Sequence, residues 1–214
     1  MVFSIITLAA TVPLLATSSV ALQDQAQNTK ERAEGDIKTE KCHMAVRASS
    51  RMSERRQKEF QDMMLVLRDN RIYLDHKKYE DHHPLTGYFL PYPDTTYDGL
   101  VTTINKDNML NWVYVDTETY QLKYGVRAEA QPQWTGPMTL IFTKDSELRL
   151  GFTGWEGFVA VEEDSGGWAV YFDKDDNALE NKLKDKAVVE IEVIRAPLEW
   201  YKPTETRAGH DEPD

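Results

Sequence analysis

An acidic run that begins at Asp173 has the composition of a cation-binding loop. Asp173, Asp175 and Asn177 occupy positions 1, 3 and 5 of such a loop, where a calcium site takes its first oxygen ligands. The template then fails, because Ala178 stands in place of the turn glycine and Lys184 in place of the bidentate glutamate. We therefore predict a solvated turn that caps a following helical turn. A calcium loop of another type stays open as an alternative.

Imidazole and carboxylate groups are concentrated in "DHKKYEDHH", residues 75–83. Such groups together can bind zinc, manganese or iron. The spacing matches no metal-site template, however, and adjacent histidines such as His82 and His83 rarely point at one metal. We predict no metal here and interpret the stretch as a polar loop after a hairpin. His82 and His83 are kept as candidates for proton transfer beside a pocket.

Glu156 stands between Trp155 and Gly157 and is the strongest single candidate for acid–base chemistry. If the residue is buried, burial would raise the pKa of its carboxyl group and suit it to proton transfer. Glu190 and Glu192 share one face of a predicted strand, as the two carboxylates of a glycosidase can. Solvent-facing charges opposite the apolar strand face are the plainer interpretation for this pair.

Aromatic side chains gather in "HHPLTGYFLPYPDTTYDGL", where Pro84, Pro91 and Pro93 predict an extended loop instead of a central strand. Such a loop could line a ligand mouth, or it could be a lid that packs onto one end of a barrel. Most of the five tryptophans have apolar strand neighbours and are expected in the core. The predicted ligand-binding residues are Tyr88, Phe89, Tyr92, Tyr97 and Trp155.

Other catalytic chemistry has little support in the sequence. There is no GxSxG motif for a nucleophilic serine, and we predict no cofactor. The single cysteine, Cys42, excludes an intramolecular disulfide. Its neighbours Lys41 and His43 would lower the pKa of an exposed thiol, but a packed, inert residue is the favoured interpretation.

Short β-branched and aromatic runs bounded by turn residues extend through most of the chain. Alternation in "CHMAVRA" places Met44, Val46 and Ala48 on one face, and Asp69–Asn70 is a hairpin turn between two apolar runs. Residues 158–161 and 168–172 are predicted to pair through a turn at 164–167. Helical turns are expected only at residues 53–64 and 178–187. The predicted fold is all-β, an antiparallel sandwich or barrel, without a repeat of fixed period.

The two ends differ from this central region in composition. Residues 1–21 form an uncharged, largely apolar segment that ends in small residues, which is typical of a secretory signal peptide, with a membrane-docking segment as the alternative. Residues 22–40 are expected to be a flexible linker, residues 41–202 a single β domain and residues 203–214 an acidic disordered tail. Secretion is predicted, and membrane contact is expected only through residues 1–22 if they are not cleaved.

The formal net charge of −11 and pI near 5.0 argue against nucleic acid as a partner, because a nucleic-acid binder needs a basic surface. The segments "GLVTTI", "LNWVYVDTETYQLKYGVR", "GWEGFVAVEE" and "GWAVYFDKDDN" occur in that order. In these segments the chain resembles a family of small proteins of filamentous fungi without an assigned activity. The resemblance covers about residues 65–195 and implies a fungal source and a role in secretion, host interaction or natural-product chemistry.

Two functions follow from these observations. The first is a non-enzymatic secreted β-domain that binds a small molecule or glycan through the aromatic residues of 84–98. The second is a lipocalin-like barrel enzyme, an isomerase or cyclase, that acts on a hydrophobic fungal metabolite with Glu156, His82 and His83 as proton carriers. The second requires a hollow barrel, because a barrel filled with side chains leaves no room for a substrate.

Overall fold

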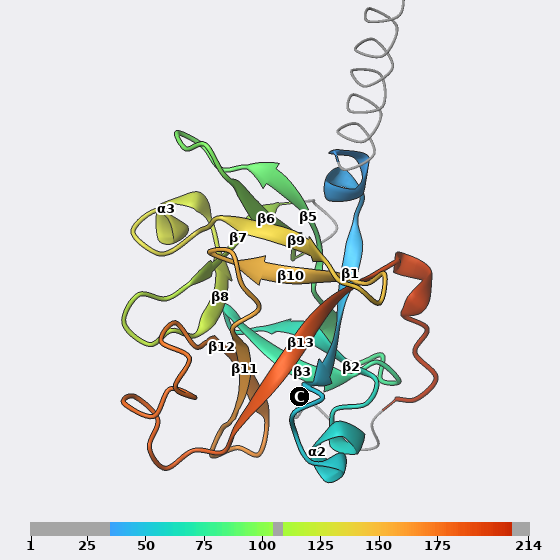
Figure 1. The fold of residues 1–214 in the computed structure, drawn as a ribbon. Coiled ribbons are helices and arrows are strands. Elements are labelled where there is room, and N and C mark those ends of the chain that lie inside the picture. The colour runs from blue at the N-terminus through green and yellow to red at the C-terminus, as the bar shows by residue number, and fades with distance from the viewer. Residues whose placement is uncertain (1–34, 105–108, 207–214) are drawn as a thin grey trace, which may run out of the picture. The chain divides into compact units, whose positions relative to one another are not determined.

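The computed structural model describes residues 35–104 and 109–206 and is built mainly of antiparallel strands (Figure 1). Contacts divide the chain into residues 1–38 and residues 39–214, and every strand belongs to the second of these units. Residues 35–39 are helical. The helices of the second unit are α2 (Glu54–Glu59), α3 (Arg127–Ala130) and the 3₁₀ turn η1 (Leu198–Trp200).

The strands form three modules of similar design. Each has two outer strands, with a hairpin between them in the chain. The bounds are β1 (Cys42–Ala48), β2 (Met63–Arg68), β3 (Arg71–His76), β4 (His83–Pro84) and β5 (Thr86–Pro91) in the first module; β6 (Asp98–Thr103), β7 (Leu110–Val115), β8 (Leu122–Gly125) and β9 (Met138–Phe142) in the second; and β10 (Leu148–Phe152), β11 (Phe158–Glu162), β12 (Trp168–Phe172) and β13 (Val188–Ala196) in the third.

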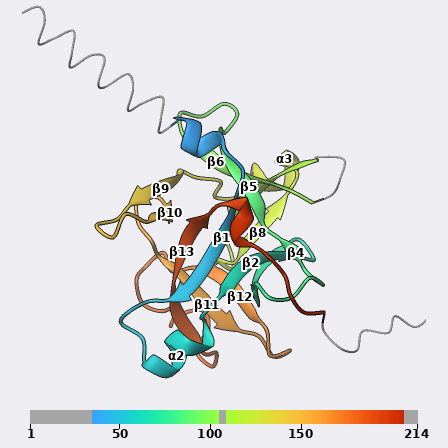
Figure 2. The ribbon, with the colours of Figure 1, turned by 90° about the vertical axis from the view of Figure 1, so that its right-hand side faces the viewer.

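The outer strands of the three modules form a six-stranded barrel. β1 pairs with β5, β5 with β6, β9 with β10 and β10 with β13, while β6 lies beside β9. The barrel closes where β13 pairs with β1 over six residue pairs, from His43 opposite Ala196 to Ala48 opposite Ile191 (Figure 2). The hairpins β2–β3, β7–β8 and β11–β12 meet through β3, which pairs with both β8 and β12.

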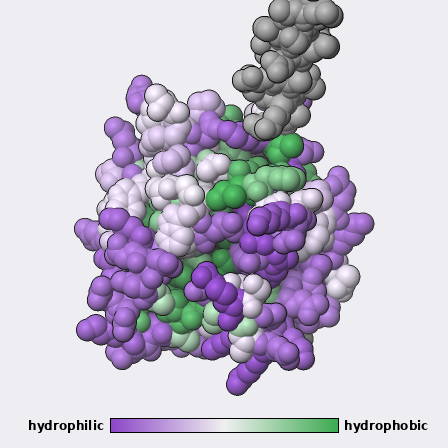
Figure 3. Space-filling view, in the orientation of Figure 1, coloured by the Kyte–Doolittle hydropathy of each residue, from purple (hydrophilic) through white to green (hydrophobic). Residues whose placement is uncertain are grey.

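The barrel interior is occupied by side chains. All six barrel strands contribute to one buried cluster, which includes Met44, Phe89, Leu100, Met138 and Val193. Phe172 sits in this cluster with its ring centroid 4.8 Å from that of Phe152, in edge-to-face geometry. Hydrophilic residues predominate on the face drawn in Figure 3, and hydrophobic ones form several separate patches there. The enzyme hypothesis requires a hollow barrel with room for a substrate, and the packed interior argues against it.

Several expectations about the elements are confirmed. The chain is all-β, and the structure is a barrel and not a sandwich. Met44, Val46 and Ala48 share the buried face of β1, and Asp69 and Asn70 have the positive φ of 50° and 59° that a tight hairpin turn requires. β11 and β12 pair as expected around the turn at 164–167.

Other expectations are wrong. Residues 86–91 form β5, a barrel strand, and the connecting loop covers only residues 92–97; Pro91 is tolerated because it is the last residue of the strand. Residues 178–187 form turns and not a helix, although Leu179 is buried as expected. The pairing pattern repeats in three modules although the sequence shows no fixed period.

The predicted ends lie partly within the described residues. Residues 1–34 and 207–214, with the proposed signal segment, fall outside them. From the expected tail, Glu205 forms a parallel bridge with Tyr79, and the backbone amides of Thr204 and Glu205 donate to the Lys78 carbonyl. Residues 203–206 are therefore held against the turn after β3. In the described ranges, no helix has the length and apolar character needed to span a bilayer.

Candidate functional site

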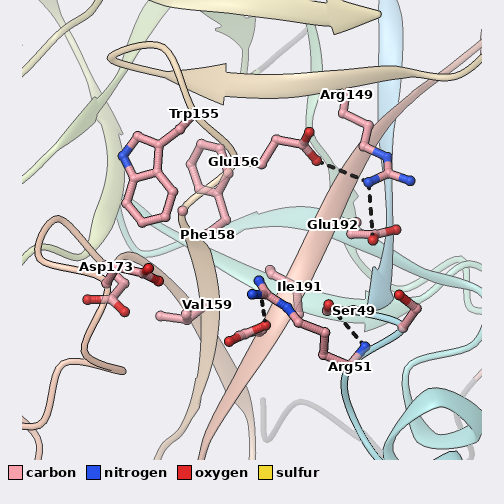
Figure 4. Close-up of a pocket in the computed structure, with 14 residues that line it drawn as sticks. Ser49, Arg51, Arg149, Trp155, Glu156, Phe158, Val159, Asp173, Ile191 and Glu192 are labelled. Atoms are coloured by element: carbon pink, nitrogen blue, oxygen red, sulfur yellow. Dashed lines mark hydrogen bonds and ion pairs between the residues drawn. The ribbon is translucent and has the colours of Figure 1, made fainter. Parts of the chain in front are cut away.

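A pocket of about 350 Å³ opens on the outer wall of the barrel (Figure 4). Its lining comes from the start of the β1–α2 connection, from strands β10, β11 and β13, from the β10–β11 connection and from the loop after β12. We call it the Trp155 pocket, and the residues on which its chemistry depends are Arg51, Arg149, Trp155, Glu156, Asp173, Asp176, Glu190 and Glu192. Three of the strand segments are adjacent because β13 pairs with both β10 and β11.

Arg149 is the centre of a charged cluster on this wall. Its Nη1 lies 3.2 Å from Glu156 Oε2 and 3.1 Å from Glu192 Oε1, and its Nη2 lies 3.1 Å from Glu147 Oε2. Arg47 joins the cluster, with Nε 2.6 Å from Glu192 and Nη2 2.7 Å from Glu147. We call these five residues the Arg149 cluster. Because each guanidinium bridges two or more carboxylates, the side chains at this end of the pocket are fixed in position.

Alternation along the strands explains why the cluster forms on the outer wall. Val46 of β1 and Ile191 of β13 face the core, so Arg47 and Glu192 face outward, directly opposite each other in the strand register. Arg149 of β10 pairs with Ile194 of β13 and thus reaches the same wall. Arg149 and Glu192 are only 14% exposed as side chains, so their ion pair is shielded more than an ordinary surface pair.

The cluster shifts the pKa values of its members. For Arg149, burial disfavours the charge, but the hydrogen bonds that it donates to Glu147 and Glu156 outweigh burial and raise its pKa. For Glu147, burial raises the pKa, but the hydrogen bonds donated by Arg47 and Arg149 outweigh it and bring the pKa below its ordinary 4.5. Both shifts favour the charged states that hold the cluster together.

The Trp155 ring packs against Gly157 and Phe172. A Cβ added at Gly157 would lie 2.4 Å from the nearest atom of the Trp155 ring, so only glycine lets the indole lie this close to the backbone. The Trp155 ring also packs against that of Phe172, with centroids 5.4 Å apart and planes at 66°. The indole therefore has a defined orientation beside the pocket.

Asp173 follows β12 and closes the pocket on the Trp155 side. Its backbone amide donates to the Gly157 carbonyl at 2.7 Å, which joins the carboxylate to the Trp155 segment. Its Oδ2 accepts from the Ala178 amide at 2.7 Å, across a turn in which Asp176 and Ala178 have positive φ. The acidic run is thus a turn, as expected, but Asp173 itself is buried and not solvated.

The opposite side of the pocket is more exposed. Arg51 Nη2 lies 2.9 Å from Glu190 Oε2, but the Arg51 side chain is 76% exposed, so this pair contributes little to stability. A second hollow, of about 690 Å³, extends from Arg149 and Glu192 past α2 to Trp200. The Arg149 cluster therefore lies between two adjoining depressions on one wall.

Of the residues proposed from sequence, Glu156 and Trp155 come together in this pocket. Glu156 is paired with Arg149 and its side chain is 30% exposed, so it lacks the burial that the proton-transfer hypothesis assumed. Its role there stays a prediction.

The four aromatic residues proposed from the 84–98 segment lie elsewhere in the structure. Phe89 is 2% exposed and belongs to the main core. Tyr92 is buried against Trp112, with ring centroids 4.7 Å apart, and stacks on Tyr97 at 5.9 Å. Tyr88 is half-buried and packs on the same small cluster. These packing contacts are closer to the packed-lid alternative than to an open ligand mouth. Ligand binding by these residues stays a prediction.

His82 and His83 do not face a common site. The His82 side chain is 6% exposed, with Nδ1 3.6 Å from Asp75 Oδ2 and its ring 5.6 Å from that of Tyr201. His83 instead places Nε2 3.0 Å from the Thr103 carbonyl oxygen. Neither residue lines the Trp155 pocket. Across residues 35–104 and 109–206, no group of three or more His, Cys, Asp or Glu side chains is arranged to hold a metal ion.

Cys42 is packed, as favoured from sequence. It is 1% exposed, and burial raises the pKa of its thiol above the ordinary value of 9.0 despite the nearby Arg195. Arg51, Glu147 and Arg149 were not proposed from the sequence. Asp173 was considered there only as a calcium ligand, and Glu192 only as one of a glycosidase pair. Alternation showed that Glu192 faces outward, but no local signal indicated that Arg47 and Arg149 would lie beside it.

Comparison with known proteins identifies the family of this chain. Residues 17–199 match the model of a family described as "Fungal beta-trefoil domain". No curated protein and no solved structure matches the chain. The match covers all the strands described above.

Gly157→Ala tests whether the bare backbone positions Trp155. The added Cβ would overlap the indole, so the ring must turn away, and we expect a change in the near-ultraviolet circular dichroism of tryptophan together with a stability loss of about 1–3 kcal/mol. Gly167→Ala is the matched control, because its Cβ would meet nothing closer than 3.6 Å. An unchanged tryptophan signal in Gly157→Ala would contradict the proposed packing.

Acid titration tests the Arg149 cluster. Because the pKa of Glu147 is lower in the folded chain than its ordinary 4.5, its contribution to stability is complete above that value and is lost as the pH falls through the folded-state pKa. Glu147→Gln should therefore flatten the loss of stability on acidification, measured as urea midpoints between about pH 5 and pH 2.5. Glu180→Gln, on an exposed turn, is the control. Equal profiles for Glu147→Gln and the unmodified chain would contradict the assignment.

Proposed function

Since the chain belongs to the fungal beta-trefoil domain family, we propose that it is a non-enzymatic protein that binds a small molecule or glycan in the Trp155 pocket. Domains of this fold can bind glycans or small ligands. The pocket volume of about 350 Å³ lies within the range of roughly 300–1,000 Å³ typical of ligand sites. The proposal uses this pocket in preference to the 84–98 segment, because the aromatic residues of that segment are engaged in packing.

One observation carries the proposal: a fixed aromatic ring and fixed polar groups line the same hollow. Trp155 supplies an apolar surface, and Glu156, Asp173 and Glu192 supply hydrogen-bond acceptors around it. Sugars and similar polyols present both apolar faces and hydroxyl donors, so this combination suits them. Because the Arg149 cluster already orders Glu156 and Glu192, binding does not have to immobilise these side chains.

Secretion is part of the proposal and is supported by the apolar segment at residues 1–21, which ends in the small residues Ser19–Val20–Ala21. A source cell that secretes the protein should release it into the medium without this segment. Mass spectrometry of the native protein measures this directly. An intact Met1 would contradict cleavage.

Trp155→Ala tests the binding site. We expect titration calorimetry against a panel of neutral and charged oligosaccharides to identify a ligand, and the substitution to weaken its binding about tenfold or more by removing the aromatic surface. Tyr88→Ala is the matched control on the 84–98 segment and should bind as the unmodified chain does. Both variants are first checked for folding by circular dichroism. The reverse pattern, with loss of binding in Tyr88→Ala alone, would place the ligand on the other surface.

A further inference from the structure

Only one of the two carboxylate oxygens of Asp173 accepts a hydrogen bond from the described residues. The residue is 4% exposed, and its Oδ2 accepts the Ala178 amide. Its Oδ1 is buried, and it accepts no hydrogen bond within the described part of the chain. An anionic oxygen that is withdrawn from water without a donor costs free energy, so a donor supplied by a ligand would be favoured here. Asp173 lines the Trp155 pocket, which is where such a donor would enter.

The charges around the pocket determine which donor fits best. Two guanidiniums, from Arg51 and Arg149, line the pocket against five carboxylates, so its formal net charge is −3. The carboxylates are those of Glu156, Asp173, Asp176, Glu190 and Glu192. Both guanidiniums are already engaged with glutamates of the pocket. No ion pair to Asp173 or Asp176 occurs in the described ranges. A positively charged donor is therefore favoured over a neutral one, and an anionic ligand is disfavoured.

Trp155 determines which other group the ligand needs beside its positive charge. The hydrogen bond from the Asp173 amide to the Gly157 carbonyl, and the contact of Gly157 with the indole, keep the carboxylate and the aromatic ring close together. An ammonium group is also attracted to the face of an indole. A ligand that fits both features has a ring that can lie against Trp155 and a protonated amine on that ring.

We infer that the Trp155 pocket recognises an amino sugar whose protonated primary amine donates to Asp173 Oδ1 while its ring lies against Trp155. The inference deepens the proposed function and rests on it. A bare divalent cation fits less well, because it needs several oxygen ligands converging on one point, and the described residues hold no such group of three. A polyamine would satisfy the charge but would leave the aromatic face without a ring to contact.

The test compares two ligands that differ only at the amine. Glucosamine tetramer and its fully N-acetylated counterpart are titrated calorimetrically into the full chain near pH 6, with spermidine as a third ligand. The free amine should bind about tenfold or more tightly than the acetylated form, which corresponds to the added strength of a hydrogen bond between charged groups. Because this comparison uses the unmodified chain, its outcome does not depend on whether any variant folds.

Asp173→Asn should abolish the preference for the free amine, since the amide keeps an oxygen for the Ala178 donor but removes the charge. Asp175→Asn, an exposed neighbour outside the pocket lining, removes the same charge and should keep the preference. Equal affinity for the two tetramers, or a preference that survives in Asp173→Asn, overturns the inference and leaves the proposed function standing. Spermidine binding as tightly as the amino tetramer overturns the sugar assignment. Failure of every oligosaccharide, here and in the wider panel, overturns the inference together with glycan binding as the proposed function.

Discussion

The pairing of β1 with β13 is the constraint on which the rest of the structure depends. These strands come from opposite ends of the domain, and their six residue pairs close the barrel. The same register places Val46 and Val193 inside, where they join the core, and Arg47 and Glu192 outside, where they face each other. A slip by one residue would exchange the two faces and bury the charges. The barrel closure and the charged wall are therefore consequences of one register.

The other strands supply the remaining residues of the pocket on this wall. β10 supplies Arg149, which bridges Glu192 and Glu156 and so connects the barrel wall to the segment that carries Trp155. The hairpin β11–β12 leads to Asp173, whose amide is tied back to Gly157. At one end of the pocket the two guanidiniums of the Arg149 cluster hold three carboxylates in fixed positions. At the other end, Asp173 presents an anionic oxygen that accepts no hydrogen bond from the described residues. Because the two ends differ, a polar ligand with one positively charged end would bind in one orientation, with that end at Asp173.

Local features of the chain could be predicted from sequence, because they depend on neighbouring residues. Alternation identified the faces of β1, and Asp69–Asn70 identified a hairpin turn that needs positive φ. β5 was missed because Pro84 and Pro91 argue against a central strand, whereas Pro91 ends β5 and Pro84 lies outside it, where proline does no harm. Glu156 and Trp155 were found as candidates from their local context. Arg149 was not found, and Asp173 was considered only as a calcium ligand, since their roles here depend on contacts between segments distant in the sequence. The threefold module pattern is likewise visible only in the strand pairing.

The most direct measurement of the central claim is the backbone ¹H–¹⁵N correlation spectrum of the labelled chain during titration with glucosamine tetramer. If the ligand occupies the Trp155 pocket, the largest shifts will fall on Gly157, Asp173 and the indole NH of Trp155, with smaller ones on Arg149 and Glu192. Resonances of Tyr88, Tyr92 and Tyr97 will stay in place. Shifts concentrated on these tyrosines, with the Trp155 indole unmoved, would contradict the account.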